Sequence, residues 1–392
     1  MTTTTKLQGI ARLSKREPER TFINLMCMFD KESLRECFNM LDRKKAVGVD
    51  GVTKSKYAIN LDNNLEDKIV QKMMQKVLES IYEPIFLECS YGFRPGRGCH
   101  DAIKALEQHF YNNEVQVVID IDLANFFGTI DHKLMEEILR EKIQDKTLMR
   151  YIIRMFKSGV LADGDLRKSD EGVPQGSICS PVLANIFAHR VIDQWVKEMV
   201  KPNCSGNVEI FRYADDGVIC CQYREDAKRI YEALGKRLAK FKLRMNEEKT
   251  KPVPFSKVEA RRGIPQGAFD FLGFTFYLGR SRKGNIIPKV KTSGKKFRAK
   301  LKNVKTWCKA VRNRIKIGEI WRIFLAKIRG HIQYYGVSHN TDKVDEFIDR
   351  ATKILYKWLN RRSQKRSFDW DKFNKFMNKR PLPKARVMHS FF

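Results

Sequence analysis

The sequence predicts an α+β fold, with a small antiparallel sheet in the centre of the chain and helices before and after it. Three observations support this prediction. Residues 115–122 are an apolar run rich in valine and isoleucine that ends in aspartate, which is typical of a buried strand. Residues 208–213 and 218–221 flank Ala-Asp-Asp-Gly, which predicts a hairpin with acids at its tip. Residues beyond 277 are basic and predict helices.

The helices expected around this sheet follow from apolar spacing and capping residues. Before the sheet, residues 20–115 predict helices and loops, interrupted by glycine-rich segments at 47–51 and 91–97. After the first strand, Ser180 and Pro181 are a helix start signal, with serine as N-cap and proline at the first helical position. The other expected elements are helices at 132–156, 225–244, 295–316, 318–335 and 342–362, and a short strand or hairpin arm at 269–277.

The charge of the chain is concentrated at one end. The formal net charge is +30, from 76 basic and 46 acidic residues. Residues 276–392 hold 32 Lys and Arg against 7 Asp and Glu, which leaves 44 against 39 for residues 1–275. So dense a positive field favours a polyanion, and we expect nucleic acid rather than an anionic membrane surface. The alternative is a basic surface that serves only solubility.

The cysteines and the N-terminus bear on the compartment. Nine cysteines are scattered without a C-x-x-C pair, which suits a reducing cytosol and predicts no zinc site. The first residues contain no apolar signal core, and no run of residues approaches the length of a membrane span. We therefore expect a cytoplasmic protein that does not bind membranes.

Three aspartates are the candidate catalytic and metal-binding residues. Asp122 ends the first strand, and Asp215 and Asp216 lie at the tip of the hairpin. Nucleotidyl transfer uses two divalent cations, and Mg²⁺ prefers hard oxygen ligands such as carboxylates on rigid elements. The three acids would serve this chemistry if the two strands are neighbours. Each motif alone is weak, because Asp-Asp-Gly is also a common turn.

The order of several motifs gives the sequence a family resemblance. Residues 118–127, 171–181, 211–216, 246–250 and 271–274 resemble, in this order, the conserved blocks of reverse transcriptases. Residues 46–53 and 90–98 resemble parts of the fingers of that family. Residues 327–331 and 359–367 resemble the thumb of proteins encoded by group II introns. The resemblance covers nearly the whole chain, and it is closest to these intron proteins.

The resemblance implies a right-hand polymerase. Residues 1–114 would be an N-terminal extension and shortened fingers, residues 115–277 the mixed α/β palm with its antiparallel sheet, and residues 278–392 a basic helical thumb or maturase domain. The implied activity is RNA-directed DNA synthesis with two Mg²⁺ ions. The implied partners are an RNA template, a DNA primer, deoxynucleoside triphosphates and group II intron RNA. Whether the protein forms a homodimer is open.

The resemblance also assigns residues around the nucleotide. Phe127 would be the steric gate against a 2′-hydroxyl, although a core aromatic is the alternative. Gly176 would let the backbone approach the nucleotide closely. Lys249 would act on the leaving pyrophosphate, or be a solvated lysine at a helix end. The full nucleotide- or template-binding set is Arg94, Phe127, Pro174, Gln175, Gly176 and Lys249.

Clusters of cations in the basic third predict contacts with an RNA backbone. They lie near tryptophans, which we expect to be core residues rather than platforms for bases. The predicted RNA-binding residues are Lys295, Lys296, Arg298, Arg361, Arg362, Lys365 and Arg366.

The sequence departs from the family between Asn64 and Glu66. There the family carries several tens of residues with a Lys-Gly-Arg-Pro-Leu type block that grips the triphosphate, and this chain lacks them. Loss of such cations would lower the rate by orders of magnitude. Three explanations stay open: a decaying gene copy, a sequence from which a segment was removed, or a variant that binds nucleotide differently. Nor does the chain hold the Cys or His cluster of a zinc-stabilised nuclease domain, which predicts no DNA cleavage.

Three functions are compatible with these observations. The first is an intron-encoded reverse transcriptase. The second is a catalytically impaired RNA-binding maturase, which assists splicing without copying RNA, and one protein can combine both roles. The third is a domesticated reverse transcriptase of antiphage defence, for which intron RNA domains would not flank the gene.

Overall fold

The computed structural model describes residues 2–41, 67–157, 160–162, 165–167, 171–173, 177–246, 250–362 and 369–391. The chain forms two compact units. The first unit comprises residues 1–102 and 119–252, and the second comprises residues 103–118 and 253–392. The division into fingers, palm and thumb at residues 114 and 277 stays a prediction.

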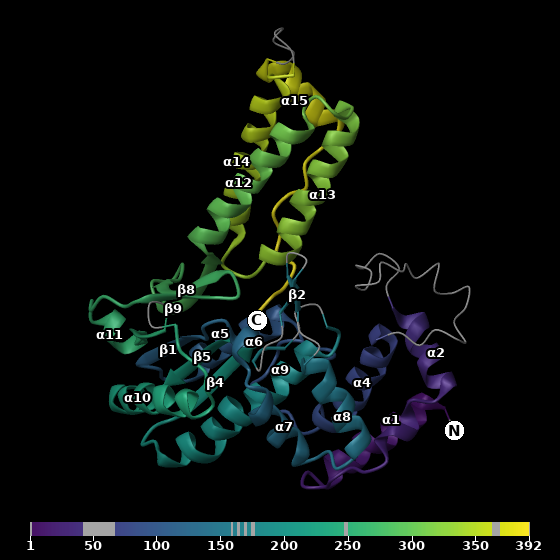
Figure 1. The fold of residues 1–392 in the computed structure, drawn as a ribbon. Coiled ribbons are helices and arrows are strands. Elements are labelled where there is room, and N and C mark those ends of the chain that lie inside the picture. The colour runs from purple at the N-terminus through teal and green to yellow at the C-terminus, as the bar shows by residue number, and fades with distance from the viewer. Residues whose placement is uncertain are drawn as a thin grey trace. The chain divides into compact units, whose positions relative to one another are not determined.

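A four-stranded sheet carries the candidate acids. Its order is β4 (Val208–Tyr213), β5 (Asp216–Cys221), β1 (Val117–Asp122) and β6 (Lys251–Pro254). Strands β4 and β5 pair antiparallel, with Tyr213 opposite Asp216, so their turn holds two residues (Figure 1). The predicted acidic hairpin is confirmed, and its second strand starts two residues earlier than expected.

Helices make up most of the rest of the first unit, and α9 begins within one residue of its predicted start. Cys179 is the N-cap and Pro181 lies in the first turn. After α9 the chain continues in two π-helical turns, η2 (His189–Asp193) and η3 (Val196–Val200), which the sequence did not predict. The other elements are α1 (Thr3–Arg16), η1 (Leu25–Met28), α2 (Lys31–Met40), α4 (Asp67–Tyr82), α6 (Phe126–Thr129), α7 (His132–Arg140), α8 (Lys146–Lys157), β2 (Val160–Ala162), β3 (Asp165–Arg167), α9 (Ser180–Ala188), η4 (Lys201–Asn203) and α10 (Arg224–Lys240).

The single helix predicted over residues 132–156 is wrong, because the chain breaks there into α7 and α8. Asp145 explains the break. Its carboxylate accepts hydrogen bonds from the backbone N–H of Leu148 at 3.0 Å and of Met26 at 2.9 Å. The acid therefore caps a new helix and ties it to the segment around Met26. The apolar spacing runs through this break, which is why periodicity alone missed it.

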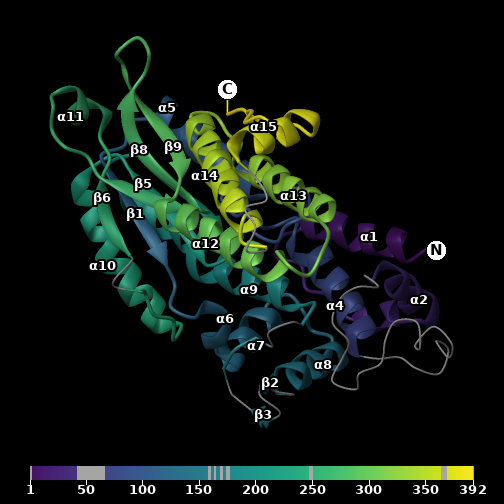
Figure 2. The same ribbon diagram turned by 90° about the horizontal axis from the view of Figure 1, so that it is seen from above.

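The second unit has a sheet packed on aromatic residues. Strands β7 (Ala268–Phe271), β8 (Phe274–Arg280) and β9 (Ile286–Thr292) form an antiparallel sheet. Helix α5 (Cys99–Asn112) contributes Phe110, whose ring lies 4.6 Å from that of Phe255. The rings of Phe269 and Phe276 stack at 5.2 Å between centroids. The expected hairpin arm at 269–277 is thus the first part of a three-stranded sheet (Figure 2).

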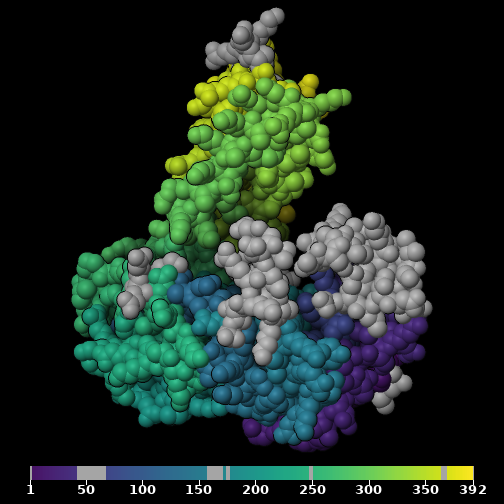
Figure 3. Space-filling model, in the orientation of Figure 1, coloured from purple at the N-terminus to yellow at the C-terminus, as the bar shows by residue number. Residues whose placement is uncertain are grey.

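Four helices complete the second unit. Helices α12 (Gly294–Val311), α13 (Ile317–Tyr335) and α14 (Thr341–Leu359) run side by side, with α15 (Trp370–Lys379) at one end of the group (Figure 1). In the space-filling view, the green to yellow atoms of this part of the chain form one continuous surface (Figure 3). A short helix, α11 (Lys257–Arg261), precedes the sheet. The three helices predicted here are confirmed, with ends that differ by up to five residues, and α15 was not predicted.

The predicted fold class agrees with this structure. Helices and antiparallel sheets are mixed as expected for an α+β protein. Among the residues described, no helix combines the length and apolar character needed to cross a bilayer.

Glu107 gives the second unit a pH-dependent stability. This residue of α5 is 0% exposed, and burial raises its pKa to about 8. Among the described residues neither carboxylate oxygen has a hydrogen-bond partner, and Nε2 of His339 lies 3.7 Å from Oε1. The unfolded chain releases this proton near pH 4.5, so stability falls as pH rises towards 8. We therefore expect Glu107→Gln to stabilise the protein by on the order of 2 kcal/mol at pH 9, and by little at pH 4. Urea denaturation at the two pH values measures this, and an equal effect at both would contradict it.

Candidate active site

The turn between β4 and β5 presents two acidic side chains. Ala214, the first residue of the turn, has a φ of 58°, a backbone conformation that costs a residue with a Cβ about 1 kcal/mol. Asp215 follows it and is exposed, and Asp216 is half-buried as the first residue of β5. The hairpin therefore places two neighbouring carboxylates at one end of the sheet.

Strand β1 brings the third acid to the same end of the sheet. Strands β1 and β5 are neighbours, which is the condition for the three acids to form one site. A Cβ placed on Gly217 would lie 3.7 Å from the Cβ of Ile121, so these two residues are adjacent across the strands. Asp122 follows Ile121 and Asp216 precedes Gly217, so each acid lies one residue from this contact between the two strands.

Asn246 and Thr250 form hydrogen bonds with Asp122. The Asn246 side-chain amide donates to Oδ1 of Asp122 at 3.1 Å, and the Asn246 backbone N–H donates to the Asp122 carbonyl at 2.8 Å. The Asp122 backbone N–H donates to the Thr250 hydroxyl at 3.1 Å. Sequence reasoning gave Asn246 no role, although it opens the block at 246–250, and this position was the available signal.

The three aspartates supply the oxygen ligands that a divalent cation prefers. In the described part of the chain, which includes the three aspartates, no group of three or more His, Cys, Asp or Glu side chains is arranged to hold a metal ion. Mg²⁺ does not require one, because it is usually held by one or two carboxylates together with water and substrate phosphates. The donor set therefore fits an open magnesium site.

Phe127 lies in a small aromatic group near the hairpin. Its ring is 5.6 Å from that of Phe126 and 6.4 Å, edge to face, from that of Phe93. Phe126 is buried, as expected for a core residue, whereas Phe127 is half-buried. Phe93 is 50% exposed and its ring lies 6.2 Å from that of Tyr213, the last residue of β4.

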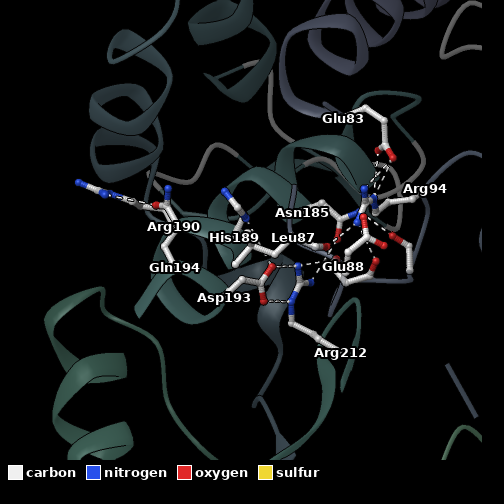
Figure 4. Close-up of polar contacts among 12 residues, drawn as sticks. Glu83, Leu87, Glu88, Arg94, Asn185, His189, Arg190, Asp193, Gln194 and Arg212 are labelled. Atoms are coloured by element: carbon white, nitrogen blue, oxygen red, sulfur yellow. Dashed lines mark hydrogen bonds and ion pairs between the residues drawn. The ribbon is translucent and has the colours of Figure 1, made fainter. Parts of the chain in front are cut away.

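Arg94, a predicted nucleotide-binding residue, forms its hydrogen bonds with groups of this chain. Its side chain is 4% exposed, and its Nε donates to the Glu83 carboxylate at 2.9 Å. Its Nη1 donates to the carbonyl oxygens of Leu87 at 2.7 Å and Ser90 at 2.9 Å (Figure 4). The guanidinium therefore fastens the loop at residues 87–94, and its predicted contact with the nucleotide stays a prediction.

Arg212, on β4, is a buried side chain of the hairpin with several hydrogen-bond partners. It is 1% exposed and forms a bidentate ion pair with Asp193, with Nε to Oδ1 at 2.7 Å and Nη2 to Oδ2 at 2.6 Å (Figure 4). Burial would raise the pKa of Asp193, but the charge and hydrogen bonds of Arg212 hold it below its usual value. Asp193 comes from the π-helical turn η2, and such turns are frequent at functional sites.

Several predicted residues lie outside the described part of the chain. These are Pro174, Gln175, Gly176, Lys249, Lys365 and Arg366. The junction at residues 64–66, where the sequence predicts that a family segment is missing, lies outside it as well. Their assignments stay predictions.

The predicted RNA-binding cations that the structure describes lie in the second unit. Lys295, Lys296 and Arg298 are exposed on α12. Arg361 is exposed and its guanidinium lies 5.3 Å from the ring centre of buried Trp358. Arg362 is half-buried and donates to the Ile315 carbonyl at 3.3 Å.

The tryptophans of this unit differ in their burial. Trp321 and Trp358 are buried, as expected for core residues, whereas Trp307 is half-buried. Trp370 is 44% exposed and stacks on Tyr356 with 4.0 Å between ring centroids. The general expectation of core tryptophans is therefore wrong for Trp370.

Comparison with known proteins gives several relatives, and two of the three described below carry intron names. The group II intron-encoded protein LtrA of Lactococcus lactis subsp. cremoris is 34% identical over 116 residues, which are 30% of this chain and 19% of LtrA. Protein YkfC of Escherichia coli K12 is 29% identical over 240 residues, covering 51% of this chain and 58% of YkfC. An uncharacterized 91 kDa protein in a cob intron of Schizosaccharomyces pombe is 37% identical over 30% of this chain and 14% of its own. This chain thus spans less than two thirds of the length of each relative.

A solved structure and a family profile complete the comparison. Telomerase of Candida albicans, in complex with a fragment of telomeric RNA, is 14% identical with a TM-score of 0.41, over 83% of this chain and 54% of that one. The profile described as reverse transcriptase (RNA-dependent DNA polymerase) matches residues 50–276, more than half of the chain. The predicted resemblance to intron-encoded reverse transcriptases and the predicted polymerase fold are confirmed. The chain belongs to the reverse transcriptase family.

Proposed function

We propose that the chain is an RNA-directed DNA polymerase of the group II intron type, which adds deoxynucleotides to a primer 3′-hydroxyl along an RNA template. One observation carries this proposal. Asp122 and Asp216 lie on neighbouring strands, each one residue from the contact between Ile121 and Gly217, in a chain whose match to the reverse transcriptase family includes these two acids and Asp215.

In this proposal, Asp122, Asp215 and Asp216 hold two Mg²⁺ ions. Bound there, the ions lower the pKa of the primer hydroxyl and neutralise charge on the triphosphate. Asn246 orients the Asp122 carboxylate through its side-chain amide. The two-residue turn fixes the spacing between Asp215 and Asp216. The protein then contributes mainly by positioning, as is general in phosphoryl and nucleotidyl transfer.

Phe127 is the proposed sugar gate. It begins α6 together with Phe126, five residues after Asp122, and its half-buried ring is supported by Phe93. The Phe127 ring, packed against Phe93 and near the three aspartates, would exclude a 2′-hydroxyl by steric contact rather than by hydrogen bonding. Pro174, Gln175, Gly176 and Lys249 are proposed for the same nucleotide site from the resemblance alone.

A second function, binding of folded intron RNA as a splicing maturase, is favoured by the cations of the second unit. Helix α12 exposes Lys295, Lys296 and Arg298 within one turn. Closely spaced exposed cations suit an RNA backbone, whose recognition depends on phosphate contacts. The intron names of the relatives support this role. It does not depend on the acidic edge, and both functions can be tested separately.

Removal of the hairpin acids tests the polymerase. We expect Asp215→Ala with Asp216→Ala to abolish primer extension on an RNA template with Mg²⁺ and four deoxynucleotides, because the ions lose two ligands. Glu225→Ala with Glu232→Ala, which removes two exposed acids of α10, is the matched control and should extend like the wild type. A folded, RNA-binding wild type that extends no primer would contradict the polymerase. A loss of intron splicing in the aspartate variant alone, with its fold unchanged, would contradict an independent maturase role.

Asn246 gives a graded test of the orientation of Asp122. Asn246→Ala should lower kcat roughly tenfold, and Asn246→Asp should lower it further, because a second carboxylate would repel Asp122. Asn203→Ala is the control, since Asn203 donates to the Met199 carbonyl on an exposed turn. Single-turnover extension measures the effect. Equal activity of Asn246→Asp and the wild type would rule out this role.

The exposed cations of α12 test RNA binding. The triple change of Lys295, Lys296 and Arg298 to Ala should weaken RNA binding and reduce the slope of log affinity against log salt by up to about 3, roughly 0.7–0.9 for each phosphate that the protein no longer neutralises. Ala at Lys228, Lys236 and Lys240, three exposed lysines of α10, is the charge-matched control. Binding measured by fluorescence anisotropy at several salt concentrations separates the two. An equal loss of affinity in both variants would mean that net charge alone attracts the RNA.

A further inference from the structure

Every N–H donor of the Arg212 guanidinium has a hydrogen-bond partner near the turn that holds Ala214 and Asp215. In addition to its bidentate pair with Asp193, Nη1 donates to the Ala214 carbonyl at 2.9 Å and to Oδ1 of Asn185 at 3.2 Å. Nη2 donates to the Ser90 hydroxyl at 2.8 Å. With Nε and Nη2 bonded to Asp193, five hydrogen bonds engage the five N–H donors that an arginine has.

These contacts join three separate segments to the turn. Asn185 lies on α9 and Asp193 on η2, while Ser90 belongs to the loop that pairs with β4 through Arg212 itself. Asn185 also donates to the Gly92 carbonyl at 2.6 Å. A Cβ on Gly92 would lie 2.5 Å from the Ala214 backbone nitrogen, so this loop closes against the turn from the other side.

The contact with Ala214 reaches the backbone unit that precedes Asp215. Its carbonyl belongs to the peptide between Ala214 and Asp215, and Ala214 has the unfavourable φ of 58°. A bond from a buried cation to that carbonyl fixes the orientation of this peptide. The direction in which Asp215 leaves the turn therefore depends on the side chain of Arg212.

A purely structural role would not need this geometry. Replacement of a buried ion pair by apolar side chains of similar volume is often neutral or stabilising. Core stability alone therefore gives no reason for a guanidinium that bonds the turn carbonyl, an amide and a hydroxyl in addition to its carboxylate partner.

We propose that Arg212 is a positioning residue, which with Asp193 holds the Ala214–Asp215 peptide and thereby sets the direction of the two hairpin carboxylates. This role rests on the proposed polymerase function only for its effect on rate. A displacement of about 1 Å in a reacting group can cost roughly 100-fold in rate.

Two variants separate positioning from stability. Arg212→Lys keeps a buried cation that can pair with Asp193, but a lysine presents its donors at one point and cannot also bond the turn carbonyl, Asn185 and Ser90. The double variant Arg212→Met with Asp193→Leu removes the charges and keeps an apolar core, so the fold is retained even if the lysine variant fails to fold.

Arg237→Lys is the matched control. Arg237, on α10, donates to the carbonyl oxygens of Arg190 and Val191 at 3.0 Å each, so it also binds η2, and neither of these two bonds involves the hairpin. This variant reports the effect of loosening η2 alone.

Amide hydrogen exchange of the peptide spanning residues 211–219, thermal unfolding and extension kinetics are measured on the full chain. We expect faster exchange at the turn in both Arg212 variants, and a fall in kcat of roughly 10- to 100-fold with less than about threefold change in KM for the nucleotide. The double variant should remain folded at the assay temperature, because it leaves no unpaired buried charge, although the Ala214 carbonyl, Asn185 and Ser90 each lose a donor. Arg237→Lys should match the wild type in turn exchange and kcat.

Two results would overturn the role of Arg212: wild-type turn exchange in both variants, or full activity in the double variant. If the wild type itself extends no primer, the proposed function fails, and the exchange measurement still decides whether Arg212 holds the turn.

Discussion

The ion pair between Arg212 and Asp193 is the interaction on which the position of the turn with Asp215 and Asp216 depends. A buried cation needs a hydrogen-bond partner for each of its donors. The bonds of Arg212 therefore hold α9, η2, the loop at residues 87–94 and the β4–β5 turn in fixed positions relative to one another. Arg94 adds a second anchor, because it ties the same loop to Glu83 on the segment that follows α4. A turn with an unfavourable residue at its first position is thus held by buried polar groups rather than by its own preference.

The candidate catalytic acids and the excess of basic residues lie in different parts of the chain. The edge with Asp122, Asp215 and Asp216 concentrates negative charge, which attracts cations and repels a phosphate backbone unless metal ions intervene. The excess of positive charge lies instead beyond residue 275, where α12 exposes several lysines. Under the proposed function, the basic helices would attract the polyanionic template, and the ions held by the three aspartates would act on one phosphate at a time.

The sequence predicted the parts of the site that depend on local pattern. An apolar run ending in Asp122 and an Asp-Asp pair between two strands are visible in a few residues, and the structure places these strands side by side. Contacts between distant residues were not predictable in this way. Asp193 and Asn185 meet Arg212 across 19 and 27 residues and a π-helical turn without a sequence signature. Likewise, Arg94 in a basic segment suggested a ligand contact, whereas its bonds with Glu83 and two carbonyls became apparent only in three dimensions.

The central claim is that the three aspartates form one site for two divalent cations. Electron paramagnetic resonance of Mn²⁺, added to the full chain with a primer–template and a non-hydrolysable deoxynucleotide analogue, tests it directly. We predict two bound Mn²⁺ per chain with the spin coupling of neighbouring ions, and loss of this signal in the Asp122→Ala variant. Two ions that persist in that variant, or no coupled pair in the wild type, would contradict the claim.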